Sequence, residues 1–205
     1  MFLTYKISTY LVFPIFFLIL CLRIIFKKET FNSLYQKTFP QKKSNFQIDN
    51  CIWFHAASIG EALSIFPIID DIKKRKDNIF ILITTNTLSS AKIVKQKMKN
   101  YEDIDHKFFP LDNPIIIRKF LNIWKPKLAI FVDSEIWPNF LTILKEKNTK
   151  LVLLNARITN KTLNRWSYVK FSAKKIFNCF DLCLPCSNES EKNLKQIGVN
   201  KIKYI

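Results

Sequence analysis

Glycine is almost missing from this sequence: of its 205 residues only Gly60 and Gly198 are glycine. The Gly-x-Gly-x-x-Gly loop of dinucleotide-binding domains and the Walker-type phosphate loop each need at least two glycines within a few positions, because the backbone must come close to a phosphate. Two glycines so far apart in the chain satisfy neither pattern. The sequence therefore excludes both of these nucleotide-binding loops.

The cysteines do not form a disulfide framework. There are five of them, an odd number, and Cys21 lies in a long apolar segment near the N-terminus, so a reducing compartment fits better. Cys183 and Cys186 have the spacing of a redox or zinc motif, but they fall on a predicted strand and the chain has only two histidines. We interpret the cysteines as packing residues and expect neither a metal site nor a cofactor.

Acidic side chains are scarce as well: 16 aspartates and glutamates stand against 33 lysines and arginines, which gives a formal charge of +17. Such a charge permits an anionic partner, namely a phospholipid surface, a phosphorylated substrate or nucleic acid. Nucleic acid is the weakest of the three, because the sequence contains no module of interleaved aromatic and basic residues.

One long apolar run is present, in the segment STYLVFPIFFLILCLRIIFKK. Its unbroken core runs from Tyr10 to Leu22, and the apolar segment extends to Ile7 and Phe26 if the Arg23 side chain reaches toward the interface. The length of the extended segment favours a helix that spans the bilayer over one that lies in the membrane surface. Basic residues gather after the segment, so the positive-inside rule places the body in the cytoplasm. Lysines also stand where a signal peptide would carry its small-residue cleavage site. We expect an uncleaved anchor helix over residues 1–28 and a basic linker over 29–50.

The remaining residues, 51–205, alternate short apolar runs with longer stretches of helical periodicity. Continuous apolar strands that alternate with helices predict a parallel sheet covered on both faces, a Rossmann-like α/β domain. The predicted strands are Cys51 to Ala56, Ile79 to Thr84, Lys107 to Pro110, Lys127 to Val132, Lys150 to Leu154, Asp181 to Leu184 and Ile202 to Ile205. The predicted helices are Glu61 to Lys76, Leu88 to Lys99, Pro114 to Trp124, Pro138 to Lys147, Lys161 to Asn178 and Ser187 to Ile197.

Polar residues follow the first predicted strand in the segment HAASIGEA. Ser58 and Glu61 have the spacing of a capping box, in which the Ser58 side chain bonds the backbone N–H of Glu61 and the carboxylate returns to the backbone of Ser58. Gly60 suits a close approach of another group to the backbone. On this pattern alone, a structural role for Glu61 is favoured over a chemical one.

Two carboxylates, Asp133 and Glu135, follow the fourth predicted strand beside Trp137. Ligands of a parallel sheet bind beyond the carboxyl ends of its strands, so this position favours a site. A solvated loop explains the pattern equally well.

Groups that suit an anion follow two other strands. Thr85 and Thr87 precede a predicted helix, where hydroxyls either cap the helix or bind an anion. Arg157 follows the fifth strand, and its planar guanidinium fits a phosphate or a carboxylate, although a surface ion pair is the alternative.

These strand-end segments resemble one family when they are taken together. IWFHAASIGE, ILITTNTLSSA, FFPLDNP, KPKLAIFVDSEIWPN, LVLLNARIT and SNESEKNLKQIGV follow the order and spacing of the N-terminal half of bacterial 3-deoxy-D-manno-octulosonic acid (Kdo) transferases, which form glycosyltransferase family 30. The apolar leader with basic flanks resembles theirs too. The most specific of these segments are His-x-x-Ser-x-Gly-Glu and Ser-Glu-Ile-Trp-Pro-Asn.

The resemblance implies a GT-B glycosyltransferase at the cytoplasmic face of the inner membrane. Such an enzyme moves Kdo from CMP-Kdo to the phosphorylated, acylated lipid A precursor during lipopolysaccharide biosynthesis. By the same resemblance Glu61 is the general base and Glu135 helps to stabilise the transition state. The expected acceptor-binding residues are Ser58, Gly60, Thr85, Thr87, Trp137 and Arg157.

The resemblance also implies a second, donor-binding domain, which has no counterpart in this chain. Residues Lys203-Tyr204-Ile205 resemble the strand that leads to the junction with that domain. We therefore expect activity only if a separate donor-domain polypeptide supplies the CMP-Kdo site. The alternative is a catalytically inactive, truncated membrane-anchored protein that only binds anionic lipid.

Overall fold

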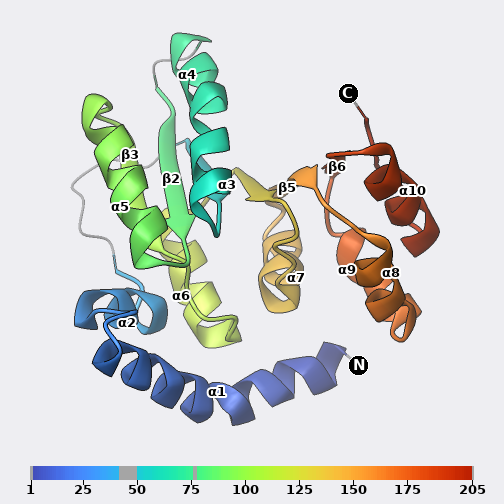
Figure 1. Cartoon of the computed structure of the whole chain (residues 1–205), viewed down its shortest axis with the longest axis horizontal. Coiled ribbons are helices and arrows are strands. Elements are labelled where there is room, and N and C mark those ends of the chain that lie inside the picture. Colours follow the sequence, from blue (N-terminus) through green and yellow to red (C-terminus); the bar gives the residue numbers. More distant parts are fainter. Residues whose placement is uncertain (1, 42–49, 76–77, 205) are drawn as a thin grey trace.

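The computed structural model describes residues 2–41, 50–75 and 78–204, and its centre is one parallel six-stranded sheet (Figure 1). The strand order is β3-β2-β1-β4-β5-β6, which confirms the predicted Rossmann-like fold. Chain order reverses between β1 and β4, and ligands of such sheets bind at this switch point, beyond the carboxyl ends of the strands. The strands are β1 Cys51–His55, β2 Phe80–Thr85, β3 Ile104–Phe108, β4 Leu128–Val132, β5 Lys150–Ala156 and β6 Leu182–Pro185.

Helices cover both faces of the sheet. On one face α3 (Ile59–Ser64), α4 (Phe66–Arg75) and α5 (Leu88–Lys97) enclose one buried apolar cluster. On the other face α6 (Pro114–Trp124), α7 (Pro138–Glu146) and α9 (Lys170–Phe177) enclose a larger one. The other helical elements are α1 Phe2–Ile25, α2 Phe31–Thr38, the 3-10 turn η1 Met98–Asn100, α8 Asn160–Ser167 and α10 Asn188–Ile197.

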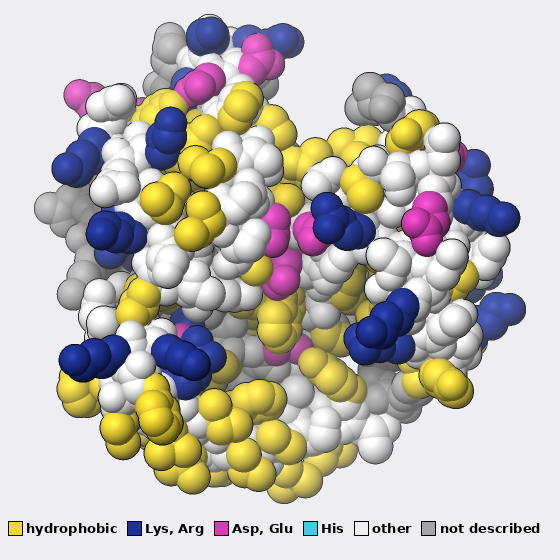
Figure 2. All heavy atoms as spheres, viewed as in Figure 1, with side chains coloured by type: hydrophobic (Ala, Val, Ile, Leu, Met, Phe, Trp, Pro, Cys, Tyr) yellow, Lys and Arg dark blue, Asp and Glu magenta, His cyan; other side chains and the backbone are white. Residues whose placement is uncertain are grey.

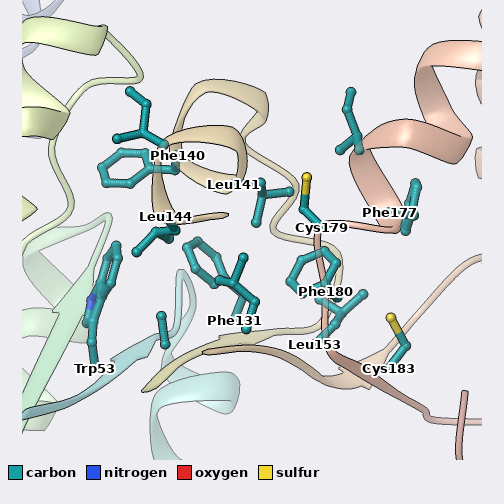
Figure 3. Close-up of a cluster of buried hydrophobic side chains, with 14 of the residues drawn as sticks. Trp53, Phe131, Phe140, Leu141, Leu144, Leu153, Phe177, Cys179, Phe180 and Cys183 are labelled. Carbon is teal, nitrogen blue, oxygen red and sulfur yellow. The ribbon is translucent and has the colours of Figure 1, made fainter. Parts of the chain in front are cut away.

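The larger cluster is built around aromatic rings (Figure 3). Trp53 on β1 is fully buried and contacts the rings of Phe131 and Phe140 at centroid distances of 5.3 and 5.6 Å. Cys183 lies in the same cluster as a free thiol, and burial raises its pKa to about 12, so it packs as a small apolar residue. Cys186 is exposed instead. Among the described residues, no group of three or more His, Cys, Asp or Glu side chains has the arrangement of a metal site.

Two of the predicted helices are each divided in two. The range Glu61 to Lys76 is split near Pro67, whose missing N–H cannot bond the preceding turn. The range Lys161 to Asn178 is split where Val169 leaves the helical conformation, with φ −129° and ψ 38°. That break lets Trp166 of α8 fold over Phe177 of α9, ring centroids 5.5 Å apart.

Two predicted strands also differ from the structure. The third begins earlier, at Ile104, because β3 is an edge strand with alternating burial, and the apolar residues after Phe108 belong to the following loop. In the described part of the last predicted strand there is a single bridge, between Cys183 and Ile202, and Ile205 lies outside the described residues.

The range 29–50, predicted as a basic linker, contains helix α2. Thr30 and Ser33 form a complete capping box at its start, and Lys37 on the helix is buried against Glu29, with Nζ 2.5 Å from Oε1. Lys37 also donates a hydrogen bond to the backbone oxygen of Asn86, which follows β2. The helix is thereby attached to the carboxyl edge of the sheet. Residues 42–49 of the predicted linker lie outside the described residues.

Helix α1 bends along the underside of the domain (Figure 1). By length and composition its residues Thr4–Ile25 qualify as a membrane span, and little of that window is buried. The Tyr5 hydroxyl donates to Asp112 Oδ2 at 2.8 Å, and Asn139 donates to the Thr9 hydroxyl at 3.1 Å. The outward face is apolar and exposed, so α1 touches the domain along one side and presents hydrocarbon on the other.

Candidate active site

The two sequence-predicted carboxylates, Glu61 and Glu135, lie on either side of the switch point. Glu61 follows β1 in the first turn of α3, and Glu135 lies between β4 and α7. Strands β1 and β4 are hydrogen-bonded neighbours, with His55 opposite Phe131, so their carboxyl ends emerge side by side. The fold therefore brings together two side chains that are far apart in the sequence.

Glu61 is held by three hydrogen bonds to two neighbouring residues in a modified capping box. The Ser58 hydroxyl accepts from the backbone N–H of Glu61 at 3.3 Å, as predicted. The carboxylate, however, returns to the N–H of Ala57 at 2.8 Å rather than to the backbone of Ser58, and its second oxygen accepts the Ser58 hydroxyl at 2.6 Å. The shift by one residue orients the carboxylate by both of its oxygens.

Glu135 accepts hydrogen bonds from two rings. Its Oε2 lies 3.1 Å from His55 Nε2 and 2.7 Å from the indole nitrogen of Trp137. Burial acts to raise the pKa of Glu135, but the hydrogen bond and charge of His55, together with the hydrogen bonds of Trp137 and Asn86, outweigh it and leave the pKa lowered. Glu135 is therefore an anion at neutral pH.

Buried polar contacts hold His55 at Nδ1, the ring nitrogen that does not contact Glu135. The indole N–H of Trp53 donates to the Thr84 hydroxyl at 2.9 Å, and that hydroxyl lies 3.0 Å from His55 Nδ1. If the Thr84 hydroxyl donates to Nδ1, the other ring nitrogen carries the proton that Glu135 accepts. The histidine ring is also stacked on Phe109, with centroids 3.7 Å apart. These contacts fix the position of the ring beside Glu135.

Asp133 adds a third acid to the site. Burial raises its pKa, Arg157 opposes that shift, and the charges of Glu61 and Glu135 reinforce it. Its backbone has a φ of +63°, a left-handed conformation that aspartate tolerates better than most residues. Arg157 forms the predicted alternative, an ion pair with Asp133 at 3.5 Å, and its side chain remains 63% exposed. Figure 2 shows acidic side chains gathered in a hollow at the centre of this face.

The remaining predicted acceptor-binding residues differ in whether they are exposed to a ligand. Ser58, Gly60 and Thr87 are exposed, and a Cβ added at Gly60 would meet open space. Thr85 is fully buried, and its hydroxyl is 2.9 Å from His106 Nε2, so it offers nothing to a ligand in this conformation. Thr85 points into the sheet because it is the last residue of β2, whereas Thr87 has already reached the start of α5.

Two site residues were missed in the sequence, His55 and Asn86. His55 is the last residue of β1, and Asn86 directly follows β2. Both occupy carboxyl ends of strands, so the rule that selected Glu61 and Glu135 also covers them. Neither has a neighbour in the sequence that marks it as a partner of Glu135.

Comparison with known proteins agrees with the motifs on which this site is built. Residues 29–205 match the family model described as 3-deoxy-D-manno-octulosonic-acid transferase (kdotransferase). A relative from Rickettsia bellii with the same described activity is 32% identical over 196 residues, which cover 96% of this chain and 46% of that protein. The chain belongs to the Kdo transferase family.

Other relatives support this membership and the fold. The Kdo transferase of Haemophilus influenzae is 30% identical over 152 residues, 74% of this chain and 35% of that protein. The chain thus spans about half or less of the length of these Kdo transferases. The crystal structure of a UDP-GlcNAc 2-epimerase from Neisseria meningitidis aligns with a TM-score of 0.51 at 13% identity, over 75% of this chain and 45% of that one, and it shows the fold alone.

Proposed function

We propose that this chain supplies the acceptor-side half of a Kdo transferase active site. In this proposal Kdo moves from CMP-Kdo to the lipid A precursor in lipopolysaccharide biosynthesis, and a donor domain outside these 205 residues provides the CMP-Kdo site. The observation that carries the proposal is the pair Glu61 and Glu135, oriented on either side of the switch point of the sheet.

Glu61 is the general base of the proposed reaction. Its carboxylate takes the proton from the acceptor hydroxyl while that oxygen attacks the anomeric carbon of Kdo, and CMP leaves with the bonding electrons on its phosphate. The N–H of Ala57 and the hydroxyl of Ser58 orient the carboxylate without filling all of its acceptor positions. Ser58, Gly60 and Thr87 offer exposed surface beside it for the acceptor.

The role of Glu135 in the proposed reaction is electrostatic, and it transfers no proton. Glycosyl transfer develops positive charge on the sugar ring, and a fixed anion stabilises such a charge more in the transition state than in the ground state. The lowered pKa of Glu135 keeps that anion in place. Trp137 orients it, and the exposed Arg157 suits a phosphate of the acceptor.

The proposed location is the cytoplasmic face of the inner membrane, against anionic lipid. The apolar outer face of α1 and the basic residues at both of its ends support an attachment of this kind.

The test is to mix the chain with a donor-domain polypeptide and follow Kdo transfer from CMP-Kdo to the lipid A precursor. Glu61→Gln should lower the rate by about 10²- to 10⁴-fold, because the amide cannot accept the proton, while it can still bond Ala57 and Ser58. The matched control is Glu102→Gln, which changes an exposed carboxylate at the opposite edge of the sheet. Unchanged transfer by the Glu61 variant would sink the catalytic assignment, and a mixture without transfer would favour the inactive lipid-binding alternative.

A further inference from the structure

A pocket of about 390 Å³ lies between α1 and the carboxyl edge of the sheet. This is within the size range of small-ligand sites in proteins. Its wall comes from α1, from α2 and the turn before it, and from the loops that follow β2, β3 and β4. It includes the charged residues Arg23, Glu29, Lys37 and Asp112. The apolar lining includes Phe16, Ile19, Leu20, Phe109, Leu111 and Trp137.

The polar part of the pocket is shared with the candidate active site. Asn86 lines the pocket, and its side chain contributes to the lowered pKa of Glu135. Trp137 lines it as well, and its indole N–H donates to the same carboxylate. Lys37 joins this polar end through its hydrogen bond to the backbone oxygen of Asn86. A molecule in the pocket therefore has one part among apolar side chains and another beside Glu135.

The outer wall of the pocket is the one helix of the described structure that is long and apolar enough for a bilayer. Side chains on its outer face are exposed, for example Leu11 at 73% and Leu18 at 59%, and Figure 2 shows hydrophobic side chains gathered along this margin. With that face in lipid, only the thickness of one helix, roughly 10 Å, separates the pocket from hydrocarbon. A lipid chain can enter the pocket past the helix with little exposure to water.

We propose that this pocket binds one fatty-acyl chain of the acceptor lipid and so draws the sugar of that lipid to Glu61 and Glu135. This inference rests on the proposed function for the identity of the acceptor. That an acyl chain occupies the pocket is inferred only from the apolar lining of the pocket and its position behind α1. Leu20 is the residue to change, because it is 8% exposed and faces the pocket, whereas Leu18 on the same helix faces outward.

The experiment uses the full chain in phosphatidylethanolamine and phosphatidylglycerol vesicles that contain a phospholipid with a diazirine on one acyl chain. After irradiation, crosslinked residues are mapped by mass spectrometry. We expect crosslinks on the outer face of α1 and a second set at Phe109, Leu111 and Trp137. The larger side chain of Leu20→Trp fills part of the pocket, so that the acyl chain buries fewer methylene groups there. We expect about tenfold fewer crosslinks in the second set, which corresponds to roughly two methylene groups left unburied. Leu18→Trp, the matched control, should leave it unchanged.

Crosslinks confined to the outer face of α1 in the unaltered chain would overturn the acyl-chain pocket, whatever the variants do. Equal crosslinking of the loop in both tryptophan variants would overturn it too. With a donor-domain polypeptide present, Leu20→Trp should raise KM for the acylated acceptor and leave KM for a deacylated acceptor unaltered. If the unaltered chain gives the loop crosslinks but no transfer, the proposed function fails while the pocket assignment stands.

Discussion

Thr84 shows how one buried hydroxyl serves two residues of the site. It accepts the indole N–H of Trp53 and contacts His55, and all three side chains are fully buried. A valine in its place has the same shape but no hydrogen-bonding group. The buried indole N–H of Trp53 would then lose its partner, while His55 Nδ1 would keep only the backbone oxygen of Thr84 at 3.3 Å. A buried group without a partner is costly because it has also lost water.

We therefore expect Thr84→Val to lower the free energy of unfolding by about 1–3 kcal/mol, measured by urea denaturation. Thr142→Val is the matched control, because that hydroxyl bonds carbonyl oxygens of its own helix, and it should change the free energy by less than about 0.5 kcal/mol. Equal effects of the two substitutions would contradict the shared role of Thr84.

At the residue scale, sequence patterns located the acids but not the partners that tune them. Glu61 and Glu135 were predicted from strand ends and from the family resemblance. The bond between His55 and Glu135 joins residues 80 positions apart, so no local spacing signals it. The left-handed backbone of Asp133 was equally hidden, because aspartate tolerates that conformation without demanding it.

Helix α7 is capped by a residue from another element. Trp137 at its N-cap position makes no side-chain cap, and instead Asp112, in the loop before α6, accepts the backbone N–H of Phe140 at 3.1 Å and that of Asn139 at 3.4 Å. The same carboxylate accepts the Tyr5 hydroxyl of α1. Burial raises the pKa of Asp112 to about 6, and the hydrogen bonds of Tyr5, Phe140 and Asn139 oppose that shift only in part.

The raised pKa of Asp112 predicts a pH dependence of stability. The folded state binds this proton more strongly than the unfolded chain, so the contribution is fully present below about pH 4 and is lost as the pH rises through about 6. Asp112→Asn cannot titrate, and its amide resembles the protonated acid. We expect the unaltered chain to lose stability relative to this variant between pH 4 and pH 7, as measured by chemical denaturation at each pH. A difference that is constant or reversed over that interval would contradict the assignment.

At the element scale, burial on both faces made the strands and helices of the domain predictable. Strand β2 is buried along its whole length, and such continuous apolar runs stand out in a sequence. Helix α2 did not stand out, because it is short and polar, and it is held by the buried pair of Glu29 and Lys37 rather than by an apolar stripe. No local sequence pattern predicts the order of the strands in the sheet.

For the whole molecule, the position of α1 decides how the protein meets a membrane. Its length favours a helix that spans the bilayer, yet Tyr5 and Thr9 attach its first half to the domain and the buried Leu20 belongs to its second half. A helix held along its side cannot cross the bilayer while the domain stays in water. The packing therefore favours a helix that lies in the plane of the membrane surface.

An epitope tag at the N-terminus separates the two arrangements. If α1 lies in the plane, the tag is on the same side as the domain, and protease added to inverted inner-membrane vesicles removes it. If α1 spans, the tag is inside the vesicles and is protected. A second tag after Ile205 is the control, because it reports the side of the domain itself. We expect protease to remove both tags, and protection of the N-terminal tag alone would establish the spanning arrangement.

Pro14 gives this helix a shape that matters for how deeply it enters lipid. A proline inside a helix leaves one carbonyl oxygen without its N–H partner and bends the axis, and α1 curves with its concave side toward the domain (Figure 1). The exposed apolar face is consequently convex, so its middle would reach furthest into the acyl region. Lys6 at one end and Lys27 and Lys28 at the other would then stay at the level of the headgroups. The curvature of one helix would set the depth, and with it the height above the membrane at which Glu61 meets a lipid-borne sugar.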